Sequence, residues 1–317
     1  MRSQLVWTLV LAAAARLAAA DSPFLVGVLE SMPRADAGES KRPRVRVVFR
    51  HAAAGWEAFP YDCPTVECLT SLPAKYPPRV TWTVSLAGLT LGTITARTPA
   101  DFGAYASIGL QTIVGRGVVP TVGKPAIEYA GFLDEPRYRP LLTTYGRRRP
   151  LRSSAGWKEG VPDPDDLNRV WPIFRQRIPR IDNCELATDT GEAGVAARPV
   201  WRTPKKWELE IPLAWVARNG DALLKVIVRE EIFKECDGPR TLPSQLWLLR
   251  RSNGQIRTLP DQLEVDRAEL AVPLEFDDML RDGHDEMLFM IAGYNRGGYV
   301  LYYDGFRKFV KYMWQYR

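Results

Sequence analysis

The sequence predicts an all-β protein that is rich in hairpins. Three observations support this class. Short runs of residues alternate between apolar and polar in the two-residue period of a strand, and glycine and proline, 24 and 25 of the 317 residues, interrupt almost every segment. In addition, several strand-like runs are joined by short turn sequences, as expected of antiparallel sheets. One short helix, near residues 164–171, is the expected exception.

The N-terminal strands are expected over residues 24–30 and 42–50. In the second run Val45, Val47 and Phe49 lie on one face, and the arginines between them lie on the other. A hairpin is expected next, because residues 80–86 and 91–95 are rich in β-branched side chains and flank the turn Ala87-Gly88.

Two further hairpins are expected in the second half of the chain. Residues 207–215 and 223–228 flank the turn at 219–221. Residues 246–250 and 255–259 flank Asn253-Gly254, a dipeptide typical of the two-residue type I′ turn. The chain then ends in a strand over residues 310–317, whose side chains alternate between apolar and polar.

A less regular region from about residue 98 to 183 separates these β-rich parts and is the expected place for a domain boundary. We therefore divide the chain into a leader (1–20), an N-terminal β region (21–150), a connecting segment (151–183) and a C-terminal β region (184–317). The basic run 147–152 is expected to be a solvated loop, with binding of an anionic group as the alternative.

The acidic run at 163–166 predicts the start of the short helix. Asp163 is the expected cap, Pro164 takes the first helical position, and Asp165 and Asp166 favour the positive end of the helix dipole. Pro172 should limit the helix to a few turns. The alternative is a pair of catalytic carboxylates or a second cation site.

The first 20 residues predict a secretory signal peptide. Arg2 precedes an apolar run over residues 5–17, and small alanines occupy 18–20. This run is shorter than the roughly 20 apolar residues of a membrane span, although a retained membrane anchor is the alternative. No later segment reaches that length, so the mature chain is expected to be periplasmic or extracellular, without a membrane span. Loss of Arg2 and Arg16 lowers the formal charge from +6 to +4, which does not require a nucleic-acid partner.

Four cysteines in an exported chain are interpreted as two disulfides. Cys63 and Cys68 are close in sequence and are expected to close a small loop, which leaves Cys184 to pair with Cys236. The alternative is a zinc site, but neither Cys184 nor Cys236 has a second ligand nearby in the sequence.

The most distinctive motif is an acidic loop with a central glycine, from Asp278 to Glu286. Calcium needs several oxygen ligands on a tight turn. With Asp278 as the first ligand, Asp282 is the fifth and Glu286 the ninth, but apolar Leu280 occupies the third. We therefore expect weak calcium binding or none, and no other cofactor.

With its flanking strands, over residues 274–303, this loop resembles the FG-GAP or VCBS repeat of integrin-type β-propellers and of many secreted bacterial proteins. The residues that carry the resemblance are Phe276, Asp278, Asp282, Gly283, Glu286 and the strand 287–291. The resemblance implies a propeller-like fold, calcium in a structural role and binding through loops. Only one such loop is visible, whereas a propeller has typically four to eight blades. The expected architecture is therefore either a degenerate β-propeller-like fold or two packed β-sandwich modules.

The chain has no motif of a serine hydrolase or zinc protease, and His51 and His284 are its only histidines. We therefore expect an exported, non-catalytic protein that binds a partner protein or a polymer at the cell envelope. The alternative is a hydrolase that acts on glycans through carboxylates. Its candidate acids are Asp163, Asp165, Asp166, Asp277, Asp278, Asp282, Asp285 and Glu286.

Overall fold

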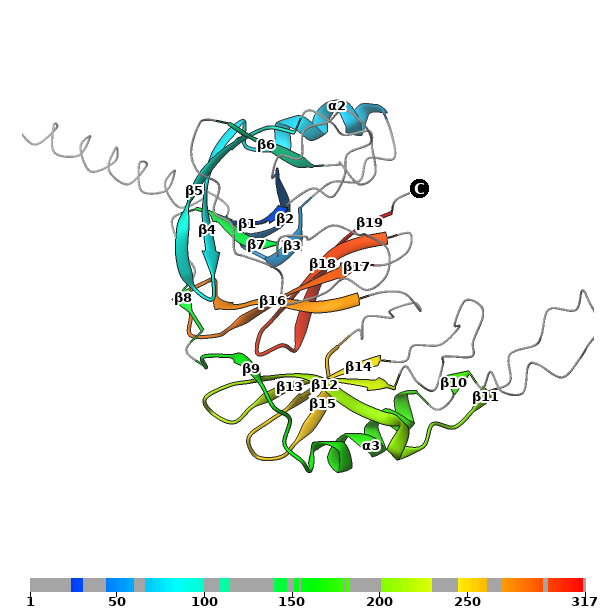
Figure 1. The fold of residues 1–317 in the computed structure, drawn as a ribbon. Coiled ribbons are helices and arrows are strands. Elements are labelled where there is room, and N and C mark those ends of the chain that lie inside the picture. Colours follow the sequence, from blue (N-terminus) through cyan, green and yellow to red (C-terminus); the bar gives the residue numbers. More distant parts are fainter. Residues whose placement is uncertain are drawn as a thin grey trace, which may run out of the picture. The chain divides into compact units, whose positions relative to one another are not determined.

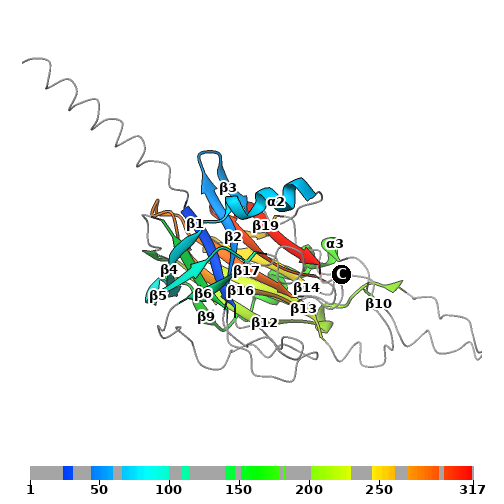
Figure 2. The same cartoon turned by 90° about the horizontal axis from the view of Figure 1, so that it is seen from above.

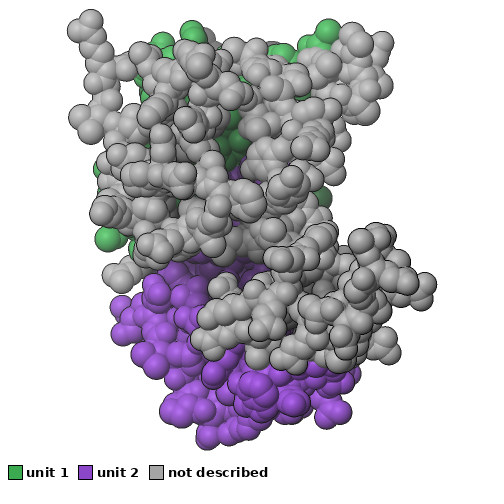
Figure 3. Space-filling view, turned by 45° about the vertical axis from the view of Figure 1, so that its right-hand side comes forward, with its two compact units in different colours: residues 1–151, 279–281, 310–312 green, residues 152–278, 282–309, 313–317 purple. Residues whose placement is uncertain are grey.

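The computed structural model describes residues 24–30, 44–59, 66–99, 109–114, 140–146, 151–153, 155–178, 181–182, 201–229, 245–260, 270–292 and 296–315. These residues lie mostly in antiparallel strands (Figure 1). No helix among them is long and apolar enough to cross a membrane. The chain divides into two compact units (Figure 3). Unit 1 comprises Met1–Leu151, Met279–Arg281 and Val310–Tyr312, and unit 2 comprises the remaining residues.

Unit 1 contains a sheet that closes on itself. The strand order is β1-β7-β4-β5-β6-β2, and β2 pairs again with β1, so six strands form a ring in which every pairing is antiparallel. Strand β3 extends β2 as a hairpin beyond the ring. The strands are β1 (Phe24–Glu30), β2 (Arg44–Ala52), β3 (Gly55–Ala58), β4 (Arg79–Leu86), β5 (Leu89–Arg97), β6 (Leu110–Val114) and β7 (Leu141–Tyr145). Closure leaves few unpaired strand edges, which would otherwise invite association with other chains.

Side chains from these strands form one apolar core, as expected for a small barrel. Alternate residues of β2 and β4, such as Val45, Val47 and Trp82, contribute to it because successive side chains of a strand point to opposite faces. Helix α2 (Val66–Lys75) adds Leu72. The indole Nε1 of Trp82 donates a buried hydrogen bond to Gln111 Oε1 at 2.7 Å, which satisfies the one polar atom of that large ring.

Two five-stranded sheets lie mainly in unit 2, drawn as separate layers in Figure 1 and overlapping in the view from above in Figure 2. The central sheet has the order β15-β14-β13-β12-β9, and the C-terminal sheet has the order β19-β18-β17-β16-β8. The central strands are β9 (Lys158–Gly160), β12 (Leu209–Val216), β13 (Ala222–Val228), β14 (Gln245–Arg250) and β15 (Ile256–Thr258). The C-terminal strands are β8 (Leu151–Arg152), β16 (Leu270–Asp278), β17 (Glu286–Ala292), β18 (Arg296–Tyr303) and β19 (Lys308–Gln315). A small ladder joins β10 (Ile181–Asp182) to β11 (Trp201–Arg202).

The two sheets share one apolar core and form a β-sandwich. Leu223, Trp247 and Leu249 of the central sheet belong to the same buried cluster as Phe289 and Tyr302 of the C-terminal sheet. The rings of Trp247 and Phe289 meet edge to face with centroids 5.1 Å apart. Aromatic pairs in this geometry contribute about 1 kcal/mol beyond their buried area, so they fix how the sheets pack.

Helix α3 (Asp166–Arg177) packs against the other face of the central sheet. Its buried residues Val170 and Phe174 join a second apolar cluster with Leu224, Val226 and Leu248. The helix starts two residues later than predicted and ends six residues later. Pro172 lies inside the helix. Its missing N–H costs one helical hydrogen bond, but the burial of Phe174 two residues later outweighs that loss.

The all-β prediction is confirmed, and the described sheets do not form a closed propeller. Hairpins β4–β5, β12–β13 and β14–β15 form where they were predicted. The predicted type I′ turn at Asn253-Gly254 is wrong: only Gly254 has a positive φ, 84°. The N–H of Gly254 donates to Arg251 O and that of Arg251 to Gln255 O, so the turn is one residue longer than a I′ turn, with a glycine bulge. Residues 217–221 repeat this pattern around Gly220.

Candidate functional site

The acidic loop between β16 and β17 is closed by its own backbone. Oδ1 of Asp278 accepts the N–H of Asp282, and Oδ2 accepts that of Gly283, both at 3.0 Å. Oδ1 of Asp282 in turn accepts the N–H of His284 at 2.9 Å. Gly283 has a φ of +87°, a conformation that glycine adopts without strain. Two of the three predicted calcium ligands therefore already bind backbone amides.

Asp277 and Glu286 form a buried cross-strand pair at the base of this loop. They face each other in the β16–β17 ladder, and both side chains are buried. Within the described part of the chain, neither carboxyl oxygen of Asp277 has a hydrogen-bond partner. Burial, then the charges of Glu275, Asp285, Glu286 and Asp278, raise the pKa of Asp277 to about 9. Asp277 is therefore a neutral, protonated acid at pH 7.

Asp285 ties the loop to the segment before β9. Its Oδ2 accepts hydrogen bonds from Ser153 Oγ at 2.5 Å and from Trp157 Nε1 at 3.1 Å. The Trp157 ring stacks on Phe276 with centroids 5.1 Å apart. Burial raises the pKa of Asp285, and the hydrogen bonds from Ser153 and Trp157 oppose that rise. Asp285 therefore links the acidic loop to residues 153–157, the segment before β9.

No group of three His, Cys, Asp or Glu side chains within the described ranges is placed to hold a metal ion. The loop also offers little to a catalytic mechanism, because Asp277 is enclosed and both oxygens of Asp278 are engaged. Asp282 is exposed on the loop surface. Strands β16 and β17 form the predicted hairpin on either side of this loop.

We expect calorimetry on residues 21–317 to detect only weak calcium binding, or none. The ion has to displace the amides of Asp282 and Gly283 from Asp278, and Leu280 provides no side-chain oxygen. Titration of Asp282→Ala is the matched control, and it should give the same trace as the wild type. A sub-micromolar affinity that disappears in Asp282→Ala contradicts this expectation.

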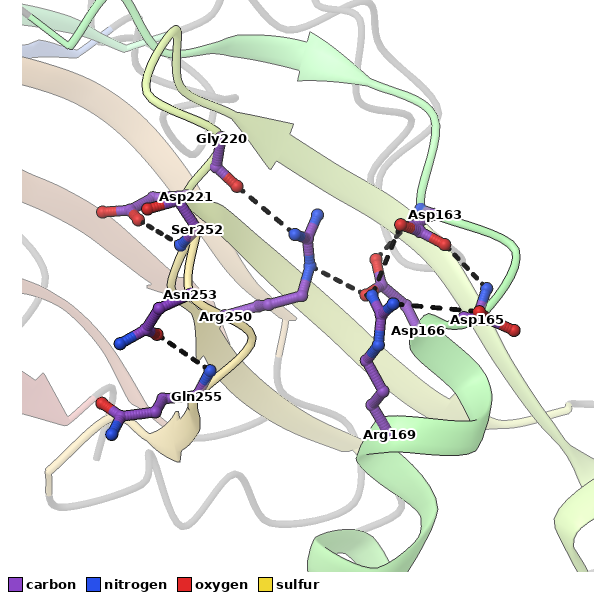
Figure 4. A network of polar contacts seen from close by, with 10 residues as sticks. All are labelled: Asp163, Asp165, Asp166, Arg169, Gly220, Asp221, Arg250, Ser252, Asn253 and Gln255. Atoms are coloured by element: carbon purple, nitrogen blue, oxygen red, sulfur yellow. Dashed lines mark hydrogen bonds and ion pairs between the residues drawn. The ribbon is translucent and has the colours of Figure 1, made fainter.

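The acidic run at 163–166 fastens helix α3 to the central sheet (Figure 4). Oδ1 of Asp166, which is fully buried, lies 2.8 Å from Nε of Arg250 at the end of β14. Arg250 also donates through Nη1 to Gly220 O at 3.3 Å. Burial raises the pKa of Asp166, and Arg250 opposes this. Asp163 does not cap the helix as predicted: its Oδ1 accepts the N–H of Asp165 at 2.8 Å, ahead of the first helical residue.

Three turns of unit 2 are bonded to one another, and we call residues 217–221, 251–255 and 304–307 the turn end. Asp221 joins the first two turns, since its Oδ1 accepts the N–H of Ser252 at 2.8 Å (Figure 4). Its Oδ2 pairs with Arg251 at 2.7 Å. Arg251 also donates to Gly305 O at 3.3 Å, which joins the third turn. The turn end therefore connects both sheets of the sandwich through polar contacts.

The turn from β18 to β19 has an unusual backbone. Asp304, Gly305 and Phe306 all have a positive φ, of 53°, 62° and 65°. For each non-glycine residue this conformation costs roughly 1–2 kcal/mol. Two features offset it: the Phe306 side chain is buried in the sandwich core, and Arg257 donates to Gly305 O at 2.5 Å and to Phe306 O at 3.2 Å. The turn is held in one conformation by its core contact and by arginine.

The turn end was not among the sites predicted from the sequence. A signal was present, because Arg250, Arg251 and Arg257 lie on both sides of the Asn253-Gly254 turn. Their convergence with residues 304–307 depends on the packing of two sheets that are distant in sequence. The structure also shows Trp207, in the 3-10 helix η3 (Lys206–Glu208), as an exposed ring, with 61 % of its surface accessible.

Several predictions fall on residues outside the described ranges. Cys63, Cys184 and Cys236 are among them, and for Cys68 the structure describes only a backbone position in α2. Both predicted disulfides, the leader 1–20 and the basic residues 147–150 therefore remain predictions.

Comparisons of the chain with protein-family models, with curated proteins and with solved structures found no match. The likeness of residues 274–303 to an FG-GAP or VCBS repeat stays a sequence resemblance.

Proposed function

We propose that this chain is an exported, non-catalytic protein that binds a polymer of the cell envelope through the turn end of unit 2. The observation that carries the proposal is the bonding of three turns, from two sheets, into one connected group. Binding residues of β-sandwiches commonly lie on loops that a rigid scaffold positions. A surface that is already ordered loses little conformational entropy when a ligand binds.

The composition of the turn end favours an anionic polymer over a partner protein. Its cations are Arg218, Arg251 and Arg307, with Arg257 and Lys308 beside it, against two carboxylates, Asp221 and Asp304. The tips of the turns are polar and exposed, at Ser252, Asn253 and Gln255, rather than apolar. Protein interfaces usually have apolar and aromatic residues at their centre, which these tips lack.

The described carboxylates give less support to a glycan hydrolase. Such an enzyme needs two carboxyl groups that face one substrate, about 5–10 Å apart. Asp277 is enclosed, Asp278 binds two backbone amides, and Asp166 is buried against Arg250. The proposal is overturned if the protein cleaves any glycan and a single carboxylate substitution abolishes that cleavage.

We expect purified residues 21–317 to co-sediment with insoluble bacterial cell-wall sacculi that retain their anionic polymers. Hydrogen exchange, with and without the sacculi, should show protection at residues 217–221, 251–255 and 304–307. Residues 206–208 around the exposed Trp207 serve as the internal control and should exchange equally in both samples. Absence of co-sedimentation, or protection confined to residues 206–208, contradicts the proposal.

A further inference from the structure

We propose that Arg257 and Arg307 form an oxyanion site at the turn end, which takes a phosphate, sulfate or carboxylate group. That this group belongs to an envelope polymer rests on the proposed function, whereas the site itself rests on the geometry of the two arginines. Three features carry the inference: one guanidinium is fixed, neither arginine has an ion pair with a described carboxylate, and the backbone that positions the second arginine is ordered.

The guanidinium of Arg257 is held in place by backbone carbonyls. Nη2 donates to Gly305 O at 2.5 Å, and Nη1 donates to Phe306 O at 3.2 Å. A guanidinium has five N–H donors, so these two bonds leave further donors for a ligand. Its fork of donors matches the spacing of two oxygens on a phosphate, sulfate or carboxylate group. An arginine that is already fixed loses less side-chain entropy on binding.

The positive charge at this position exceeds the acidic charge beside it, although Lys308, and then the charge of Arg307, help to lower the pKa of Asp304. Asp221 pairs with Arg251 at 2.7 Å, and Asp304 pairs with Lys308 at 3.1 Å, so the two nearby carboxylates already have cations. Neither Arg257 nor Arg307 forms an ion pair with a described carboxylate. Burial, then Arg251 and Arg307, hold the pKa of Arg257 below its ordinary value. An anion relieves this repulsion between like charges.

The backbone brings Arg307 next to Arg257. Arg307 directly follows Phe306, whose carbonyl accepts the hydrogen bond from Arg257. Its own N–H donates to Tyr303 O at 3.1 Å and to Asp304 O at 3.2 Å, which closes the turn. Phe306 is buried, and the centroid of its ring lies 5.9 Å from that of the Trp157 ring. The exposed Arg307 side chain therefore starts from an ordered position beside a fixed guanidinium.

The site is tested on residues 21–317 by titration with inorganic phosphate and with sulfate, against chloride at equal ionic strength. The readout is the NMR signal of each arginine Nε–H group. We expect saturable shifts of the Arg257 and Arg307 signals with phosphate and sulfate, and none with chloride. Arg175, exposed on helix α3, is the matched control and should not respond.

Two variants of the site and one control variant separate the site from general charge effects. Arg307→Gln changes an exposed side chain and should keep the fold, yet weaken phosphate binding at least fivefold; Arg257→Gln should weaken it at least tenfold. Arg175→Gln should leave it unchanged. Equal losses in Arg307→Gln and Arg175→Gln, or shifts that chloride reproduces, overturn the inference.

The sacculus experiment distinguishes this inference from the proposed function. If phosphate shifts Arg257 and Arg307 but sacculi are not bound, the oxyanion site stands and the envelope function fails. If sacculi protect the turn end while phosphate and sulfate cause no saturable shift, the envelope function stands and the oxyanion site fails. Polyphosphate and heparin are then bound to the protein and displaced with increasing salt. The polymer that needs the higher salt concentration for displacement carries the preferred group, phosphate or sulfate.

Discussion

Asp277→Asn should stabilise unit 2 at neutral and alkaline pH, by an amount that grows as pH rises. Asp277 is buried, and within the described part of the chain its two carboxyl oxygens accept no hydrogen bond. Asparagine has nearly the same shape and is neutral at every pH. The substitution therefore resembles permanent protonation of Asp277.

The sign follows from the pKa of Asp277, which is raised from 3.8 to about 9 in the folded chain. Between these values the folded state holds a proton that the unfolded state has released, so folding becomes less favourable as pH rises. The stability is fully present below pH 4 and is lost progressively up to about pH 9. The expected slope is about 1.4 kcal/mol per pH unit, which amounts to roughly 4 kcal/mol at pH 7.

Urea denaturation of the wild type and of Asp277→Asn between pH 5 and 9 measures this effect. The two should differ by about 1.5 kcal/mol at pH 5 and increasingly above it, up to about pH 9. Asp282→Asn is the matched control, since Asp282 lies exposed on the same loop and an asparagine oxygen can still accept the N–H of His284. A loss of stability in Asp277→Asn that is the same at every pH shows that the carboxyl is not protonated in the folded chain.

Arg250→Met should destabilise unit 2 by about 3 kcal/mol, because it leaves Asp166 buried without its nearest cation. Only 13 % of the Arg250 side chain is exposed, and Asp166 is fully enclosed. The remaining partners of Asp166 are the N–H of Asp163 at 3.0 Å and Arg169 at 3.5 Å. The loss of Arg250 also removes the hydrogen bond to Gly220 O, which links helix α3 to the turn end.

Arg169→Met is the matched control for this prediction. Arg169 contacts the same carboxylate, but 39 % of its side chain is exposed, and exposed ion pairs contribute less than about 1 kcal/mol. Urea denaturation should therefore rank the variants clearly, and hydrogen exchange should show loss of protection in helix α3 for Arg250→Met alone. Equal destabilisation by both substitutions rules out a dominant role for the Arg250–Asp166 pair.

Local features of the fold were predictable because they depend on residues that are close in sequence. The turn at Ala87-Gly88 places two left-handed residues between strands, and Val45 and Val47 of β2 share one core as their alternation predicts. Phe49 lies beyond a bulge in the β1–β2 ladder, and Arg46, predicted to lie on the opposite face, is also buried. The end of helix α3 was mispredicted because the low helix propensity of Pro172 is a local property, whereas the burial of Phe174 depends on the sheet that the helix packs against. The type of the Asn253-Gly254 turn was mispredicted because Arg251 N–H pairs with Gln255 O, which lengthens the turn.

The residue sequence was sufficient for the all-β class, for three hairpins and for the acidic loop, since periodicity and turn chemistry act over a few residues. Tertiary structure alone decided that six strands of unit 1 close into a ring, because that depends on the return of β2 to β1. It also decided the roles of the charged residues. Asp166 pairs with Arg250, which lies 84 residues later in the sequence, and Arg257 binds the carbonyls of Gly305 and Phe306 in the turn from β18 to β19. These pairings form only when separate sheets and a helix pack together, and no local pattern encodes them.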